Sequence, residues 1–246
     1  MSIVHSIVDK NGVLLHALLD SDTEDLGMFN AHMEAKNVRI IEGPSGGNAM
    51  LLGDETATVT IDLPFSPYLM PEGTIEFWAK LPHEDRPFSP GRGQPWFFGL
   101  ERKGQTHNNH FVFGFNYNDG GRGGGLAGRI HAFASLATHR VGEVSSAAET
   151  GLLGDTPDGW HHYAVICKWD KVDFSEGQGN TLLFTIDGKV VAYSEQMRDN
   201  NFFDETRDTE SKFHFVIHDS DSDCTFPVAM SDLKVWDYAK LPTVGK

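Results

Sequence analysis

An Asp-Gly pair lies at the centre of Leu182-Leu183-Phe184-Thr185-Ile186-Asp187-Gly188-Lys189-Val190-Val191-Ala192-Tyr193. The runs on either side are rich in apolar and β-branched residues, which favour extended strands. Asp and Gly adopt the positive φ angles that a two-residue type I′ turn requires. The stretch therefore predicts a β-hairpin, and the rest of the chain repeats its strand-like composition.

A second strand is predicted by the alternating pattern of Gly73-Thr74-Ile75-Glu76-Phe77-Trp78-Ala79-Lys80-Leu81. Ile75, Phe77 and Ala79 share one face of such a strand, because side chains alternate between the two faces. We expect this face, and Phe77 in particular, to meet the core. Trp78 falls on the opposite face together with Glu76, so we expect a second layer to cover that face as well.

Short β-type runs separated by Gly, Pro, Asn and Asp clusters continue along the chain, and helical periodicity is almost absent. Three stretches without this pattern, 82–94, 118–128 and 197–211, are predicted to be long surface loops. No internal repeat or interdomain linker is evident, so residues 1–246 are predicted to form a single all-β domain. The predicted strands are 13–19, 37–41, 49–52, 56–63, 73–81, 95–101, 110–117, 129–134, 159–169, 181–187, 189–195, 212–218 and 226–236.

The composition restricts the classes of partner. Hydrophobic residues make up 39% of the 246 residues, which is enough for a large core. The formal net charge is −15, so the long-range field repels phosphate backbones and anionic lipid headgroups. We therefore expect neither nucleic acid nor a membrane surface as a partner. The many carboxylates would still suit a hard cation such as calcium.

The two cysteines and the N-terminal sequence indicate the cellular compartment in which the protein is made. Cys167 and Cys224 fit no paired metal spacing; they are either two buried thiols or a single bridge. Residues 1–10 lack the basic and apolar segments of a signal peptide. We expect a product made in the cytoplasm that reaches the outside by cell lysis or as part of a larger particle.

Four segments, in this order, resemble the laminin-G-like branch of the concanavalin A-like lectin and glucanase sandwiches. That resemblance implies a jelly-roll of two curved antiparallel sheets, often with a groove on the concave sheet and often with calcium at the rim. It does not fix a function, because the fold carries lectins, adhesion modules and hydrolases. The segments are Gly12-Val13-Leu14-Leu15-His16-Ala17-Leu18-Leu19-Asp20, Gly73-Thr74-Ile75-Glu76-Phe77-Trp78-Ala79-Lys80, Asp158-Gly159-Trp160-His161-His162-Tyr163-Ala164-Val165 and Met230-Ser231-Asp232-Leu233-Lys234-Val235-Trp236-Asp237.

The same resemblance suggests a setting and some residue roles. The first segment, followed by a Gly-rich turn at 43–47, is most similar to versions found in bacteriophage and bacterial surface proteins. The resemblance also implies that Trp160 is a core residue and that Glu76 is a structural glutamate. For His161 and His162 it implies packing and hairpin support.

Catalysis by a glycosidase needs two carboxyl groups that flank the scissile bond. Hydrolases that share this fold place theirs two residues apart on one strand, whereas Glu76 has Thr74 and Trp78 as its same-face neighbours. We therefore expect no catalytic residue, and a glycoside hydrolase is the most distant alternative.

Paired histidines and a Gly-rich segment give no stronger signal for a site. His161 and His162 are adjacent on a predicted strand, so they point to opposite faces and cannot jointly bind one ion. His107 and His110 are predicted to lie in a solvated loop. The segment 119–128 lacks the Gly-Lys-Ser/Thr ending of a phosphate-binding loop.

Three carboxylates alternate in a predicted turn between two strands, at Asp219, Asp221 and Asp223. Cys224 and Met230 occupy positions where a helix-loop-helix calcium site requires Gly and Glu. The turn is therefore not that motif, and it is either a calcium-binding rim loop or a plain acidic turn.

A separate calcium site is suggested by the two ends of the chain. Asp20 follows the first predicted strand and Asp232 lies on the last. The termini of such sandwiches usually lie together, and two adjacent carboxylates would otherwise repel each other.

A ligand-binding edge is predicted where a strand ends beside the Gly-rich segment. Aromatic rings such as Trp96 and Tyr117 can stack on the apolar face of a sugar. Asn116, Asn118 and Arg122 would then bind its hydroxyl groups.

These observations favour a non-catalytic module that recognises a glycan or glycoprotein surface on a virion or cell. The alternative is a purely structural virion component, such as a capsid decoration or tail protein, without glycan affinity. In either case the long loops at 82–94 and 118–128 predict contacts with other protein chains, in an oligomer or on a particle.

Overall fold

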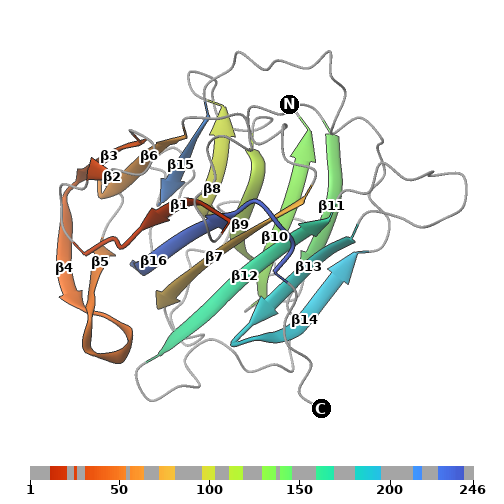
Figure 1. Ribbon diagram of the computed structural model, residues 1–246. Coiled ribbons are helices and arrows are strands. Elements are labelled where there is room, and N and C mark those ends of the chain that lie inside the picture. The colour runs from red at the N-terminus through yellow and green to blue at the C-terminus, as the bar shows by residue number, and fades with distance from the viewer. Residues whose placement is uncertain are drawn as a thin grey trace, which may run out of the picture.

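The chain folds into two antiparallel β-sheets that pack against each other (Figure 1). The computed structural model describes residues 12–20, 25–26, 31–53, 56–63, 72–80, 96–102, 111–118, 129–136, 139–145, 159–168, 181–194, 213–217 and 227–240. These residues contain no α-helix, only a short 3-10 turn, η2 (Pro44–Gly46). The predicted all-β sandwich is confirmed.

The front sheet, which faces the viewer in Figure 1, has eight strands. In spatial order they are β14 (Lys189–Ser194), β13 (Thr181–Ile186), β12 (Trp160–Lys168), β7 (Glu72–Lys80), β16 (Val228–Trp236), β5 (Asn48–Leu52) and β4 (Val38–Glu42), and β1 (Val13–Ala17) pairs with β16. Strands from the two ends of the chain thus meet in the middle of this sheet.

The back sheet also has eight strands. In spatial order they are β11 (His139–Ser145), β10 (Arg129–Leu136), β9 (Phe111–Asn118), β8 (Trp96–Arg102), β15 (Phe213–Ile217), β6 (Thr58–Leu63), β3 (Ala31–Lys36) and β2 (Asp25–Leu26). Figure 1 shows β8, β9 and β10 behind β16, β7 and β12. The two sheets therefore form two layers.

The core lies between the sheets and is rich in aromatic rings. Phe77 on β7 and Tyr163 on β12 are in direct register, and their rings stack with centroids 5.6 Å apart. Phe215, on β15 of the back sheet, is also completely buried. The prediction that Phe77 is a core residue is confirmed.

A second apolar cluster covers part of the outer face of the front sheet, the face that points away from the back sheet. Trp160 lies three residues before Tyr163 on β12 and therefore on the opposite face. It packs against Ala49 and Ala229 and is only 4% exposed. Trp160 is buried as expected, and the expected second layer exists at this end of the sheet.

The hairpin between β13 and β14 has the predicted turn. Asp187 and Gly188 have φ angles of 50° and 75°, and Ile186 pairs with Lys189 across the turn. The Asp187 N–H donates to the His162 carbonyl at 2.8 Å. The turn therefore also joins the hairpin to β12.

Each predicted strand has a counterpart in the structure, but β2, β3 and β11 were not predicted. The sequence of β3 is Ala-His-Met-Glu-Ala-Lys, which contains no β-branched residue. Pairing with β6 makes it a strand. Asn37, with a φ of 53°, then ends β3, and the chain crosses into β4 of the other sheet.

The predicted loops 82–94 and 197–211, and residues 119–128 of the third, lie outside the described residues. Cys224 also lies outside them, so the pairing of the cysteines stays open. Among the described residues, no helix has the length and hydropathy needed to cross a membrane.

Candidate binding faces of the two sheets

Glu76 is the buried centre of a polar network on the outer face of the front sheet. Its side chain is 7% exposed. The indole N–H of Trp236 donates to Oε1 at 2.9 Å, and Lys240 Nζ donates to both carboxylate oxygens at 2.8 and 2.9 Å. A general acid must present a proton to its substrate, whereas Glu76 accepts three hydrogen bonds. The geometry supports the structural role that the sequence suggested.

The residues after β16 cover this network, and we call 237–240 the C-terminal strap. Thr74 Oγ1 donates to the Tyr238 carbonyl at 2.9 Å and accepts from the Lys240 N–H at 2.8 Å. The Asp237 N–H donates to the Gly12 carbonyl at 3.0 Å. The strap thus forms the second layer over Thr74 and Glu76. The sequence predicted a cover but gave no signal for which segment supplies it.

His161 and His162 point to opposite faces of β12, as predicted. His161 is buried, and its Nδ1 donates to Asp187 Oδ2 at 2.7 Å. The backbone N–H of His162 donates to Asp187 Oδ1 at 2.9 Å. The side chain of His161 and the backbone of His162 therefore hold the hairpin turn, in agreement with the support role that the resemblance implied.

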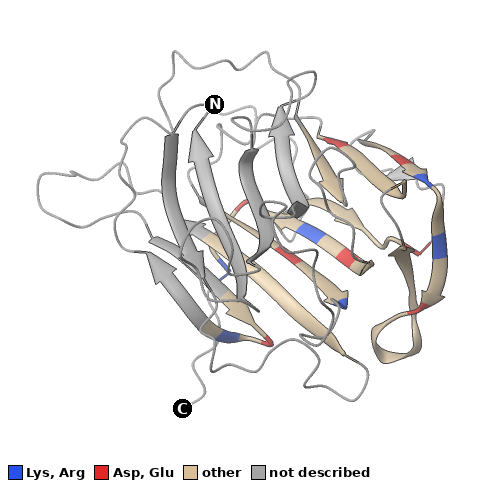
Figure 2. Ribbon diagram, turned by 180° about the vertical axis from the view of Figure 1, so that it is seen from behind, with Lys and Arg blue, Asp and Glu red and all other residues tan. Residues whose placement is uncertain are grey.

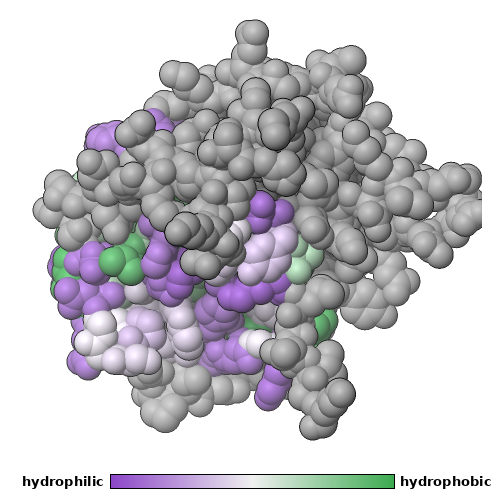
Figure 3. Space-filling view, in the orientation of Figure 1, coloured by the Kyte–Doolittle hydropathy of each residue, from purple (hydrophilic) through white to green (hydrophobic). Residues whose placement is uncertain are grey.

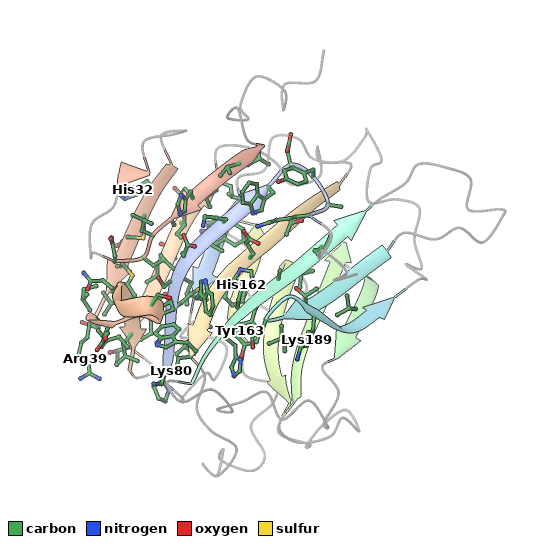
Figure 4. The ribbon with its side chains drawn as sticks, turned by 60° about the horizontal axis from the view of Figure 1, so that its bottom comes forward. His32, Arg39, Lys80, His162, Tyr163 and Lys189 are labelled. Carbon is green, nitrogen blue, oxygen red and sulfur yellow. The ribbon has the colours of Figure 1, made fainter. Side chains whose placement is uncertain are left out.

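The ring of His162 lies on the outer face between Trp78 and Glu76. Its centroid is 5.2 Å from that of Trp78, and its Nε2 is 3.7 Å from Glu76 Oε2. Burial lowers the pKa of His162, and the nearby Glu76 carboxylate only partly opposes this effect. The imidazole is therefore neutral at neutral pH. Figure 4 labels His162 beside Tyr163, its buried neighbour on β12.

Asp232 joins β1 to β16 on the same face. Its Oδ1 lies 2.6 Å from His16 Nε2, and Lys234 Nζ donates to its Oδ2 at 2.6 Å. These hydrogen bonds, first that of His16, lower the pKa of Asp232 to about 2. Figure 2 shows the acidic and basic positions side by side on β16.

The structure describes residues of one of the two predicted calcium sites, that of Asp20 and Asp232. In the part of the chain that the structure describes, no three His, Cys, Asp or Glu side chains come together. At Asp232, Lys234 already supplies the positive charge that a cation would bring, and Asp20 follows the end of β1. Asp219, Asp221 and Asp223 lie outside the described residues, so calcium there stays a prediction.

The predicted sugar-binding residues come from β8 and β9, for which the structure describes the backbone. Trp96 pairs with Asn116 across these strands, and Asn116 pairs with His131 on β10. The three positions form one row across the back sheet. Sequence reasoning did not single out His131, because the sequence does not show which residues of neighbouring strands pair with each other.

Register also assigns these positions to a face of the back sheet. Buried Phe215 pairs with Leu100, which pairs with Phe113, so Phe113 belongs to the core-facing side of β9. Positions 115 and 117 share that side, and positions 116 and 118 belong to the other. The structure thus groups Asn116 and Asn118 and separates both from Tyr117.

Two further pairs flank this row along the strands. Asn118 pairs with Arg129, which places a basic residue in a parallel row, two residues along the strands from Asn116 and His131. Gly99 pairs with Gly114, two residues before Asn116, so two neighbouring positions beside the row carry no side chain. Arg122 lies outside the described residues. The arrangement combines aromatic, amide and cationic residue types in neighbouring rows of one sheet.

No family model matches the sequence, and no curated protein matches it. Solved structures match the fold. The binding domain of Paraclostridial Mosquitocidal Protein 1 is 13% identical, with a TM-score of 0.60 over 94% of this chain and 50% of that domain. The ligand-binding domain of botulinum neurotoxin serotype D, in complex with N-acetylneuraminic acid, is 10% identical, with a TM-score of 0.61 over 93% and 48%.

The binding domain of botulinum neurotoxin DC in complex with SialylT gives a similar match, at 10% identity, a TM-score of 0.58 and coverage of 93% and 48%. This chain thus spans about half the length of these domains. At such identities the likeness concerns the fold alone. The chain has a two-sheet β-sandwich fold, and its structural neighbours are β-rich binding domains of toxins.

Proposed function

We propose that this protein is a non-catalytic recognition module that binds a glycan or glycoprotein surface through the back sheet. One observation carries the proposal: strand register brings Trp96, Asn116 and His131 into one row. An aromatic ring provides a stacking surface for a sugar, and amide and imidazole groups hydrogen-bond its hydroxyls. Beside the row, the paired residues Gly99 and Gly114 carry no side chain.

An acidic sugar is the ligand class that we favour. Arg129 and Asn118 form a pair two residues along the strands from the row, and a guanidinium group binds a carboxylate with two parallel hydrogen bonds. Two structural neighbours, both binding domains of botulinum neurotoxins, are complexes with N-acetylneuraminic acid and with SialylT. They support this choice by analogy of fold.

We place the module in a wider setting. We propose a single laminin-G-like domain over residues 1–246, made in the cytoplasm, displayed on a virion or cell surface and in contact with other protein chains. The four segments quoted from the sequence support this assignment. Calcium at Asp219, Asp221 and Asp223 would fit the acidic composition.

A glycan array followed by titration of the best-bound oligosaccharide tests the proposal. We expect sialylated glycans to be retained, and Trp96→Ala or Asn116→Ala to weaken the affinity by about tenfold. Glu34→Gln is the matched control, because Glu34 is an exposed residue of β3 at the other end of the same sheet. Equal affinities of all three variants and the unmodified chain would contradict this site.

A purely structural particle component is the second candidate. Its support is the edge strand β4, where Ile40 is 42% exposed and where β5 is the only pairing partner among the described strands. An exposed apolar edge strand is a surface on which another chain can pair. Retention of no glycan, together with an oligomer in native mass spectrometry, would favour this candidate.

A further inference from the structure

Lys240 occupies a cradle made by Glu76 and Trp236 on the outer face of the front sheet. Its ammonium group lies 2.8 and 2.9 Å from the two Glu76 oxygens and 4.6 Å from the centre of the Trp236 ring. A carboxylate and an aromatic face are two independent attractions for a primary ammonium group. The cradle thus has the chemistry of a lysine-recognition site.

The receptor half of this contact belongs to the sheet. Glu76 is buried on β7, and the indole N–H of Trp236 on β16 donates to its Oε1 at 2.9 Å. The two strands are paired in register, with Trp236 opposite Thr74 and Lys234 opposite Glu76. The carboxylate and the ring are therefore held in place by groups other than Lys240.

The cationic half belongs to the C-terminal strap. The Lys240 side chain is 43% exposed, whereas that of Glu76 is 7% exposed, so Lys240 reaches the carboxylate from the solvent side of the sheet. Figure 3 shows hydrophilic residues gathered over the middle of this face. Lys240 therefore fills the cradle from the outside, as a ligand would.

The charges around the cradle leave it anionic when Lys240 is absent. His162 Nε2 is 3.7 Å from Glu76 Oε2, but burial lowers its pKa and keeps the ring neutral at neutral pH. The other charged groups that act on this site are Lys234 and Asp187, and Lys234 donates to Asp232 at 2.6 Å. The ammonium group of Lys240 is thus the positive charge closest to Glu76 among the described residues.

We propose that this cradle is a recognition site for a lysine side chain of a basic partner protein, held closed by Lys240 in cis. The formal net charge of −15 draws a basic partner toward the chain. Lys240 occupies the cradle in most chains and leaves it open in only a fraction of them. The apparent affinity for a partner is the affinity of the open cradle multiplied by that fraction. Displacement of the strap would expose the site, independently of any glycan bound to the back sheet.

Two blocked tripeptides test the proposal, acetyl-Gly-Lys-Gly-amide and the same peptide with norleucine in place of lysine. Norleucine keeps the aliphatic chain and lacks the ammonium group. The reporter is the indole N–H resonance of Trp236 in a nitrogen-proton correlation spectrum, assigned with Trp236→Phe. Each peptide is titrated into the unmodified chain, Lys240→Ala and Lys240→Ala combined with Glu76→Gln, in amine-free buffer.

We expect a saturable shift of the Trp236 resonance when the lysine peptide is added to Lys240→Ala, with a Kd on the order of millimolar. The norleucine peptide should give no saturable shift, and the unmodified chain should bind the lysine peptide at least about tenfold more weakly. Glu76→Gln should remove the binding that Lys240→Ala created. Circular dichroism and thermal unfolding check that each variant is folded.

A folded Lys240→Ala variant without a saturable shift would overturn the proposal. Equal binding of the lysine and norleucine peptides would also overturn it, because the contact would then not depend on the ammonium group. This comparison needs only the single variant, so it decides the question even if the double variant does not fold.

Discussion

The inner and outer faces of the front sheet use the same strands for different kinds of contact. On the inner face, β7 and β12 contribute Phe77 and Tyr163, whose rings stack in the core. On the outer face the same strands contribute Glu76 and His162, which lie in a network with the C-terminal strap.

The two faces are stabilised by different interactions. Burial raises the pKa of Tyr163, with a smaller effect from Asp187, so the inner face excludes charge. The outer face contains a buried carboxylate because Lys240 and Trp236 supply its partners. Substitutions on the inner face should therefore destabilise the fold by removing buried side-chain volume. Substitutions on the outer face should destabilise it by removing the hydrogen-bond partners of Glu76.

The largest effect is expected from Phe77→Ala on the inner face. Loss of a completely buried ring leaves a cavity, and the free energy of unfolding should fall by about 3–5 kcal/mol. Urea-induced unfolding measures the change. Trp160→Ala, in the outer apolar cluster, should cost a similar amount, and Val190→Ala is the exposed control, with a change of about 0.5 kcal/mol or less. A loss below about 1 kcal/mol at Phe77 or Trp160 would contradict tight packing there.

A smaller effect is expected from Glu76→Gln on the outer face. The substitution keeps the shape but removes the charge that pairs with Lys240. Because Lys240 is partly exposed, we expect the free energy of unfolding to fall by about 1.5 kcal/mol, at the low end for charged hydrogen bonds.

Glu34→Gln provides the matched control for this prediction. Glu34 pairs with Lys36 at 3.1 Å, but both side chains are more than half exposed, so the cost should stay below about 0.5 kcal/mol. If both substitutions have the same small effect, the outer network does not stabilise the sheet. Both glutamates form an ion pair with a lysine, but only Glu76 is buried. A larger loss of unfolding free energy for Glu76→Gln than for Glu34→Gln would therefore be due to burial of the carboxylate.

The smallest effect concerns the pH dependence of the Asp232 contact. Its pKa is about 2 in the folded chain, below the ordinary value of 3.8. A lowered pKa gives stability that is complete above about pH 4 and is lost as the pH falls through about 2. Asp232→Asn should therefore reduce the slope of unfolding free energy against pH in this window, whereas Glu42→Gln on an exposed edge should not. An unchanged slope in Asp232→Asn would contradict the assigned pKa.

The sequence predicted the features that depend on neighbouring residues. Asp187-Gly188 specified a type I′ turn because only the φ angles of those two residues matter. The alternation around Phe77 specified one buried face because strand geometry repeats every two residues. The opposite orientations of His161 and His162 followed from the same period.

Long-range pairing decided the rest. Strand β3 has a sequence that does not favour strands, and it becomes one through its pairing with β6. Lys240 reaches Glu76 across 164 residues of sequence, and Trp96 meets Asn116 and His131 only through the register of β8, β9 and β10. Turn chemistry and periodicity are properties of contiguous residues, so the sequence by itself determined the turn at Asp187-Gly188, most of the strands and the buried face of β7. The order of the strands, the cover of the outer face and the composition of both candidate sites arise from contacts between distant segments, which only the tertiary structure decides.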